Sequence, residues 1–181
     1  MSVSRLSRLV PLALLTAGLA GCGPDKNEFA PPCPQPSLVQ NLSDISRYRA
    51  NSTGHDLTDL VIQGRITQIG GTCKFVEKGS LKVETTVVLR AEMQRGPSMP
   101  AGEVEVPVFL AIADGNTIID KTVFPVRVSF PANVDRVTMT SPEVMLVLPT
   151  TAAKSPAAFS VIAGFQLTPD ELAANRHRAG R

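Results

Sequence analysis

The sequence predicts a mainly β protein, built as an antiparallel two-sheet sandwich with one short helix near the C-terminus. Three observations support this prediction. Apolar and polar residues alternate with a period of two in several segments, turn signals separate those segments, and helix-capping residues stand near the end of the chain. About 145 residues follow a proline-rich stretch, which is the size of one domain with a core of its own.

The clearest strand runs from Leu81 to Met93. Its odd-numbered positions are apolar except for Thr85, whereas the positions between them include Lys82 and Glu84. Successive side chains of a β-strand point to opposite faces of the sheet, so this pattern produces one apolar face. A helix would scatter the same apolar side chains around its circumference, which excludes an amphipathic helix here.

Shorter alternating segments predict the remaining strands. They lie at residues 60–66, 104–112, 126–130, 144–148 and 159–167. Turn signals fall at Gly70-Gly71, Lys78-Gly79-Ser80, Gly96-Pro97 and Asp114-Gly115-Asn116. About six to eight strands of this length are typical of an immunoglobulin- or fibronectin-like sandwich architecture, and a small barrel is the alternative.

The segment from Thr168 to Glu171 predicts the start of a helix. Thr168 is a favourable N-cap, Pro169 suits the first helical position, and Glu171 stands three residues after the cap, as in a capping box. We expect a short helix from Pro169 to about Asn175 that covers the open end of the sandwich.

The first residues have the three parts of a secretory signal. Arg5 and Arg8 precede an apolar stretch from Leu9 to Ala20, and small residues follow. The stretch is about 12 residues long, whereas a helix needs about 20 residues to span a bilayer. We therefore expect residues 1–21 to be a signal peptide rather than a transmembrane helix.

The run Leu19-Ala20-Gly21-Cys22 closes this segment, and it resembles the lipobox of bacterial lipoproteins. The resemblance implies cleavage before Cys22 and a covalent diacylglycerol, with acyl chains such as palmitate, on the Cys22 sulfur. It also implies a lipid-anchored protein of the cell envelope that faces the periplasm. Gly23 rather than an aspartate follows Cys22, which by the same resemblance favours the outer membrane over the inner membrane. No other cofactor is expected.

The segment after Cys22 is rich in proline. Residues 22–36 contain five prolines, which disfavour both a helix and a central strand. We expect these residues to form a tether between the lipid and the folded part. Residues 37–181 are then expected to form a single β-sandwich domain.

The charge balance gives no indication of a nucleic-acid partner. Once residues 1–21 are set aside, 16 basic and 16 acidic residues remain, because Arg5 and Arg8 are the charged residues of the signal. Domains that bind nucleic acids carry an excess of basic residues. We expect the partners to be the membrane, through the lipid anchor, and an envelope protein.

Cys33 and Cys73 form an even pair once Cys22 carries lipid. In an oxidising compartment such a pair favours a disulfide. The bridge would close a loop of about 40 residues and would tie the tether to the domain. The alternative is two free thiols, with Cys73 buried in a strand.

The sequence contains no convincing catalytic arrangement. His55-Asp56 with Asp59 is the best candidate for a hydrolase, yet neighbouring glycine and asparagine residues indicate a polar loop. Asp114-Gly115-Asn116 with Asp120 has oxygens that suit calcium, but a hairpin turn explains the same residues. We expect no catalytic residue and no metal site.

Tyr48, flanked by Arg47 and Arg49, is the clearest candidate for an exposed aromatic residue. Tyrosine and arginine are enriched at binding hot spots, so the triplet is a candidate partner-binding site. We therefore expect a non-enzymatic, membrane-anchored module that binds an envelope protein or supports an envelope assembly. The alternative is a module that binds a small ligand or a cell-wall polymer.

Overall fold

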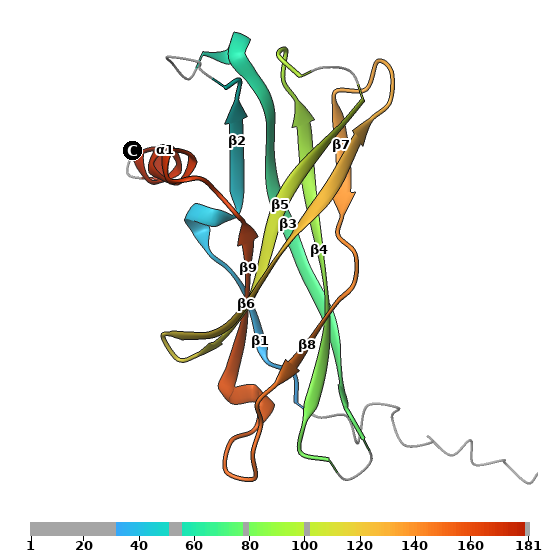
Figure 1. Ribbon diagram of the computed structural model, residues 1–181, viewed down its shortest axis with the longest axis vertical. Helices are drawn as coiled ribbons and strands as arrows, with labels where there is room; N and C mark the ends of the chain where they lie inside the picture. Colours follow the sequence, from blue (N-terminus) through green and yellow to red (C-terminus); the bar gives the residue numbers. More distant parts are fainter. Residues whose placement is uncertain (1–31, 51–55, 78–79, 100–101, 180–181) are drawn as a thin grey trace, which may run out of the picture.

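A computed structural model describes residues 32–50, 56–77, 80–99 and 102–179. The chain is mainly β, with two packed sheets of four and five strands and one short C-terminal helix (Figure 1). The sandwich predicted from the alternating segments is confirmed. The expected signal peptide and Cys22 lie outside the described residues.

The four-stranded sheet has the order β1-β9-β5-β6. These strands are β1 (Gln35–Leu38), β5 (Gly102–Asp114), β6 (Thr117–Phe130) and β9 (Phe159–Phe165). Strand β5 pairs with both β6 and β9 in antiparallel fashion, whereas β1 runs parallel to β9. The sandwich is therefore antiparallel except where β1 joins this sheet.

The five-stranded sheet is organised around one long strand, β4. Its members are β2 (Asp44–Tyr48), β3 (Leu60–Phe75), β4 (Val83–Arg95), β7 (Arg136–Thr140) and β8 (Val144–Leu148). Strand β4 pairs with β3 on one side and with both β7 and β8 on the other. Strands β2 and β7 were not predicted, because β2 is polar at three of its five positions and β7 has only two apolar residues, Val137 and Met139.

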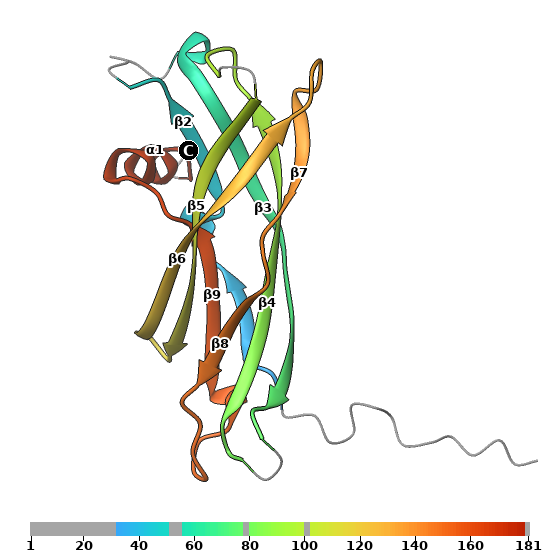
Figure 2. The same ribbon diagram turned by 45° about the vertical axis from the view of Figure 1, so that its right-hand side comes forward.

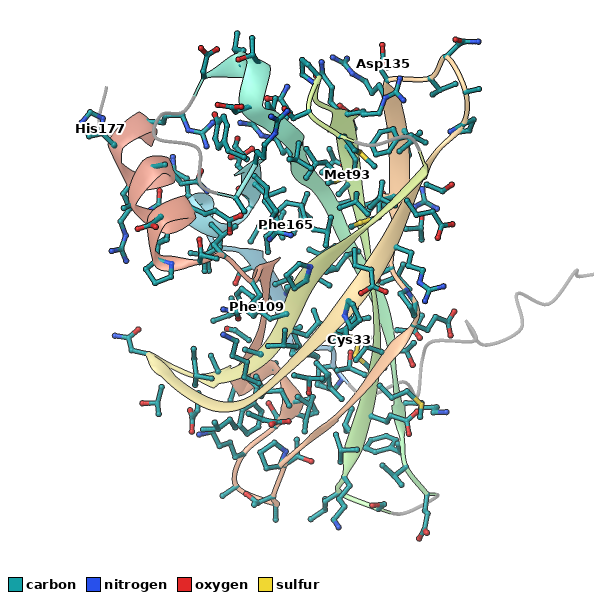
Figure 3. All side chains as sticks on the ribbon, turned by 45° about the horizontal axis from the view of Figure 1, so that its top comes forward. Cys33, Met93, Phe109, Asp135, Phe165 and His177 are labelled. Atoms are coloured by element: carbon teal, nitrogen blue, oxygen red, sulfur yellow. A yellow bond between two sulfur atoms is a disulfide. The ribbon has the colours of Figure 1, made fainter. Side chains whose placement is uncertain are left out.

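The core lies between the inner faces of the two sheets. Met93 and Phe165 are both fully buried in it (Figure 3). Most of the predicted apolar face is buried and lies opposite a matching row on β5: Val83, Val87, Leu89, Ala91 and Met93 on β4, with Val106, Val108, Leu110 and Ile112 on β5. The prediction is wrong for Leu81, which precedes β4 and is 56% exposed. Each fully buried aliphatic side chain contributes about 1.5–3 kcal/mol, so these two rows dominate the stability.

Strand β5 is buried on both faces in its second half, from Val108 to Ala113. On its outer face, Lys121 Nζ lies 4.5 Å from the centroid of the Phe109 ring. The same ring is close to Gly164, where an added Cβ would lie 2.7 Å from a ring carbon and 2.8 Å from the Cβ of Leu42. Burial from both sides explains why this part of the sequence is continuously apolar instead of alternating.

The predicted disulfide between Cys33 and Cys73 is present, and the two Cα atoms are 5.6 Å apart. Strand β1 begins at Gln35, inside the segment expected to be a tether, and pairs with β9. Pro36 is tolerated there because β1 is an edge strand. In the chain-entropy account, closing a loop of this length stabilises the fold by about 4 kcal/mol.

Strands β5 and β6 form a hairpin at the predicted Asp114-Gly115-Asn116 turn (Figure 2). Asp114 pairs with Thr117, and Gly115 has a φ of 58°. Tight two-residue hairpins need a positive φ at their first central position, which favours glycine. The turn therefore has the chemistry that the sequence indicated.

The C-terminal helix, α1 (Pro169–Ala179), extends further than predicted. Its capping box is formed: the Thr168 N–H donates to Glu171 Oε2 at 2.8 Å, and the Glu171 N–H donates to Thr168 Oγ1 at 3.3 Å. The helix lies beside β2 instead of covering the open end of the sandwich (Figure 1). Within the described ranges, every helix falls short of the length and apolar character needed to cross a bilayer.

The prediction of a turn at Gly70-Gly71 is wrong, because both residues lie within β3. Gly71 pairs with Val87 of β4, and an added Cβ on Gly71 would lie 2.3 Å from the backbone oxygen of Thr86. An added Cβ on Gly70 would meet no atom within 4 Å. The close approach of two backbones, and not a reversal of the chain, explains the glycine at position 71.

The substitution Gly71→Ala should lower the free energy of unfolding by about 2 kcal/mol, because the new methyl group forces the β3 and β4 backbones apart. Gly70→Ala is the matched control and should change that free energy by less than about 1 kcal/mol. Urea unfolding followed by circular dichroism measures both values. Equal losses for the two variants would contradict the close-approach explanation.

Candidate functional site

Helix α1 covers the edge of β2, and one buried amide holds it there. The side-chain amide of Asn175 donates hydrogen bonds to the backbone oxygens of Asn41, at 3.0 Å, and Asp44, at 2.8 Å. Asn175 is only 6% exposed. One bond satisfies the carbonyl of Asp44 in β2, which is an edge strand in the described part of the sheet, and the other satisfies Asn41 in the preceding 3-10 turn η1 (Gln40–Leu42).

Arg47 also joins β2 to the helix. Its Nε donates to Glu171 Oε1 at 2.9 Å, so one carboxylate serves both the capping box and an ion pair. Arg49 donates from Nη2 to the hydroxyl oxygen of Ser98 at 2.7 Å, and Tyr48 is half-buried. The Arg-Tyr-Arg triplet singled out in the sequence therefore does not form one exposed cluster.

A polar groove of about 300 Å³ lies beside this edge, on the outer face of the five-stranded sheet. Cross-strand pairing aligns one row of polar residues across β2, β3, β4 and β7: Ser46, Gln63, Gln94 and Arg136. Gln63 Nε2 donates to Gln94 Oε1 at 2.9 Å, and Arg136 Nη2 donates to the same oxygen at 3.4 Å. The row forms a polar floor with a guanidinium group at its β7 end.

Arg178 of α1 places a second guanidinium group at the β2 end of the row. Both of its Nη atoms donate to Ser46 Oγ at 3.2 Å, and Nη2 also donates to Asn175 Oδ1. Within the described part of the chain, neither Arg136 nor Arg178 forms an ion pair with a carboxylate. A guanidinium group has five N–H donors, so both arginines keep donors that a ligand could use.

A neighbouring row of the groove carries Asp44, Arg65 and Glu92. Arg65 donates to the Asp44 carboxylate through Nε at 2.6 Å and through Nη2 at 3.3 Å. This hydrogen bonding, followed by the charge of the same carboxylate, raises the pKa of Arg65 above its ordinary value. Arg65 and Asp44 thus largely neutralise each other, and Arg136 and Arg178 outweigh Glu92 in the remaining charge of the groove.

A second groove opens on the side where β6 and β8 are sheet edges. In the described fold β6 has only β5 as a paired neighbour, and every side chain from Thr117 to Val123 is exposed. Large apolar side chains make up much of this surface: Ile118 (55% exposed), Ile119 (44%) and Val123 (49%) on β6, with Met145 (64%) and Val147 (54%) on β8. Exposed apolar residues on a sheet edge are a feature that proteins usually avoid.

The groove between these edges has a volume of about 480 Å³. Its apolar lining comes from both sheets and includes Ile112, Ile119, Val147 and Phe159. Asp114 and Lys154 form an ion pair within the same lining, and Lys154 Nζ lies 5.0 Å from the centroid of the Phe159 ring. An apolar floor beside one ion pair suits an amphipathic polypeptide better than a small polar ligand.

The pairing of two prolines shows which residues of β6 point their backbone N–H and C=O groups away from β5. Pro107 of β5 pairs with Pro125 of β6, and neither has an N–H to donate. Hydrogen-bonded and non-hydrogen-bonded pairs alternate along an antiparallel ladder, so Lys121 and Val123 also direct their N–H and C=O groups away from β5. In agreement, the Lys121 N–H donates to the carboxylate of Asp120 at 2.8 Å.

Of the remaining candidates from the sequence, Asp114 and Asp120 both line the second groove. His55 lies outside the described residues, and Asp56 caps the short 3-10 turn η2 (Leu57–Asp59) through a hydrogen bond with the Thr58 N–H. Asp114 pairs with Lys154, whereas Asp120 bonds its neighbour's backbone. Within the described ranges, His, Cys, Asp and Glu side chains form no group of three or more that could hold a metal ion.

No family model, curated protein or solved structure matches the chain. Neither groove was identified from the sequence. The polar groove depends on the register of four strands, and the apolar groove forms where the β6 and β8 edges of the two sheets come together. One local signal was available for the second groove: Ile118 and Ile119 are adjacent, and adjacent strand residues cannot both face the core.

The substitution Asn175→Ala should lower the free energy of unfolding by about 2 kcal/mol, because two backbone carbonyls lose their partner. It should also speed hydrogen exchange of the α1 amides. Arg176→Ala, an exposed site on the same helix, is the control and should change the free energy of unfolding by less than about 0.5 kcal/mol. Unchanged exchange in Asn175→Ala would show that other contacts hold the helix.

Proposed function

We propose that this protein is a membrane-anchored lipoprotein of the cell envelope and that it binds a partner polypeptide at the free edge of β6. The observation that carries the proposal is the combination of an unpaired strand edge with the apolar groove beside it. In this proposal the protein is a non-enzymatic binding or assembly module. The lipid on Cys22 would keep it at the membrane, where the partner is also found.

Strand addition is the binding mode that suits this edge. Lys121 and Val123 direct backbone hydrogen-bonding groups outward, toward the position of an added strand. The Lys121 N–H would exchange its bond to the Asp120 carboxylate for one to that strand. The exposed stretch from Thr117 to Val123 would accept a partner strand of about seven residues, or roughly 23 Å. Alternate side chains of that strand would enter the groove next to Ile119 and Val147, so apolar residues at every second position would be selected.

A second candidate function is the binding of a small ligand or wall polymer that carries negative charge. The polar groove favours it, because Arg136 and Arg178 stand at the two ends of an amide-lined floor without carboxylate partners in the described part of the chain. Guanidinium groups bind carboxylates and phosphates through paired hydrogen bonds. This function uses a different face from the β6 edge, so the two candidates can be tested separately.

The first test is in-cell photo-cross-linking with a photoreactive residue in place of Ile119. We expect one envelope polypeptide to be captured there and not from Thr138, an exposed control position on the outer face of the other sheet. Val123→Pro removes an outward N–H and should reduce that product about tenfold or more. Val123→Thr keeps the N–H and should retain the product. Equal capture from Ile119 and Thr138 would contradict binding at the edge.

The second candidate predicts that fragments of cell-wall polymer with free carboxylates raise the melting temperature of the protein. Arg136→Gln should weaken that binding by about tenfold, since a charge-assisted hydrogen bond contributes about 1.5–3 kcal/mol. The matched control is Arg90→Gln, which replaces an exposed arginine of β4 on the same outer face of the sheet as Arg136 and should leave binding normal. Equal losses in both variants would point to non-specific attraction instead of a site.

A further inference from the structure

The end of the sandwich where β3 meets β4 exposes large apolar side chains. Phe75 is 43% exposed, Val76 is 42% exposed and Leu81 is 56% exposed. The loop between β8 and β9 lies at the same end (Figures 1 and 2), and its Thr150 hydroxyl donates to the backbone oxygen of Leu81. Ala152 and Ala153 of that loop are exposed as well. These five apolar residues, Phe75, Val76, Leu81, Ala152 and Ala153, form what we term the apolar end.

The opposite end of the sandwich has a different character. One large apolar side chain is comparably exposed there among the described residues, Leu57 at 71%, and it stands between Asp56 and Asp59. The loop between β6 and β7 contributes Asp135, which pairs with Arg95 at 2.6 Å. When the two ends are compared, the apolar end therefore carries most of the exposed large apolar side chains, whereas the single one at the other end stands between charged residues.

The N-terminal part of the chain joins the fold at the apolar end. The disulfide fixes Cys33 to Cys73, and Cys73 precedes Phe75 by two positions in β3. Only about 11 residues separate Cys22 from Cys33, and a fully extended chain of that length spans at most about 40 Å. Figure 3 shows Cys33 far from Asp135 of the opposite end. A lipid on Cys22 would therefore keep the apolar end, and not the charged end, close to the bilayer.

We propose that the apolar end rests in the headgroup region of the same bilayer that carries the lipid on Cys22; this inference rests on the anchor in the proposed function. The occupant is a lipid surface because a phenylalanine, a valine and a leucine at one tip suit the boundary between headgroups and acyl chains. Lys74 and Lys82 flank these residues, and both are exposed. Lys74 pairs with Glu84 at 2.9 Å and the exposed Glu77 adjoins Val76, so Lys82 is the cation best placed to reach lipid phosphates.

This contact would orient the whole molecule. With the apolar end down, the long strands β3 and β4 stand away from the bilayer and the charged end faces outward (Figure 1). The β6 edge then opens sideways, where a partner strand can approach it without displacing lipid. The disulfide is the element that sets this orientation, because it makes the tether leave the fold at the apolar end.

The chain contains no tryptophan, so one introduced tryptophan reports on a single position. We would reconstitute the lipidated protein in phosphatidylethanolamine and phosphatidylglycerol vesicles that contain brominated lipids, which quench tryptophan within the bilayer. In Leu81→Trp, most of the emission should be lost. In Ala132→Trp, a matched reporter in the exposed β6–β7 loop at the charged end, the emission should stay intact. Adding Phe75→Ser and Val76→Ser to Leu81→Trp should abolish the quenching.

Three results would overturn the proposal. Equal quenching of the two reporters would show that no end is preferred, and absence of quenching from both would show that the tether holds the protein clear of the lipid. A blue-shifted but unquenched Leu81→Trp signal would assign the apolar end to a second copy of the chain. Flotation of the same vesicles tests the anchor separately, since loss of flotation in wild type as well as in Cys22→Ser would overturn the lipoprotein assignment itself.

Discussion

The structure depends on the face-to-face packing of two long hairpins, β3–β4 and β5–β6. Their inner faces bury the alternating apolar rows that include Leu89 and Met93 on one side and Val108 and Leu110 on the other. A shift of one residue in either register would move a whole row into solvent, so the two registers are strongly specified. These registers also set the positions of surface features such as the polar row that ends at Arg136.

In the described fold, the four sheet edges differ in how they are protected. That difference distinguishes the edges that are closed from the side that is open to a partner. Strand β2 is covered by α1 through Asn175, and β1 is short and carries Pro36. Strands β6 and β8 instead keep exposed apolar residues beside a groove. Because unprotected edges favour association with other chains, this side of the sandwich is where a binding function is best supported.

The local rules succeeded where a few neighbouring residues decide the outcome. Thr168 and Glu171 form the predicted capping box, and the predicted turn at Asp114-Gly115-Asn116 joins β5 to β6, with a positive φ at Gly115. The rules failed where distant segments decide. Gly71 faces the β4 backbone and does not turn the chain, Arg47 is engaged by Glu171 of the helix, and α1 lies on an edge and not over an end.

The sequence by itself determined the sandwich class, the pairing partners Cys33 and Cys73, the start of the C-terminal helix and the hairpin between β5 and β6. Alternation, capping and turn chemistry are properties of contiguous residues. The Cys33–Cys73 pairing was predicted by setting Cys22 aside as the expected lipid site, since three cysteines otherwise allow three pairings. Only the tertiary structure decided which edges stay open, which polar residues share the groove and which end carries the tether. Those features arise when segments far apart in the chain pack together. Hydrophobic burial drives that packing, and because it is non-directional, a local pattern does not specify which segments will meet.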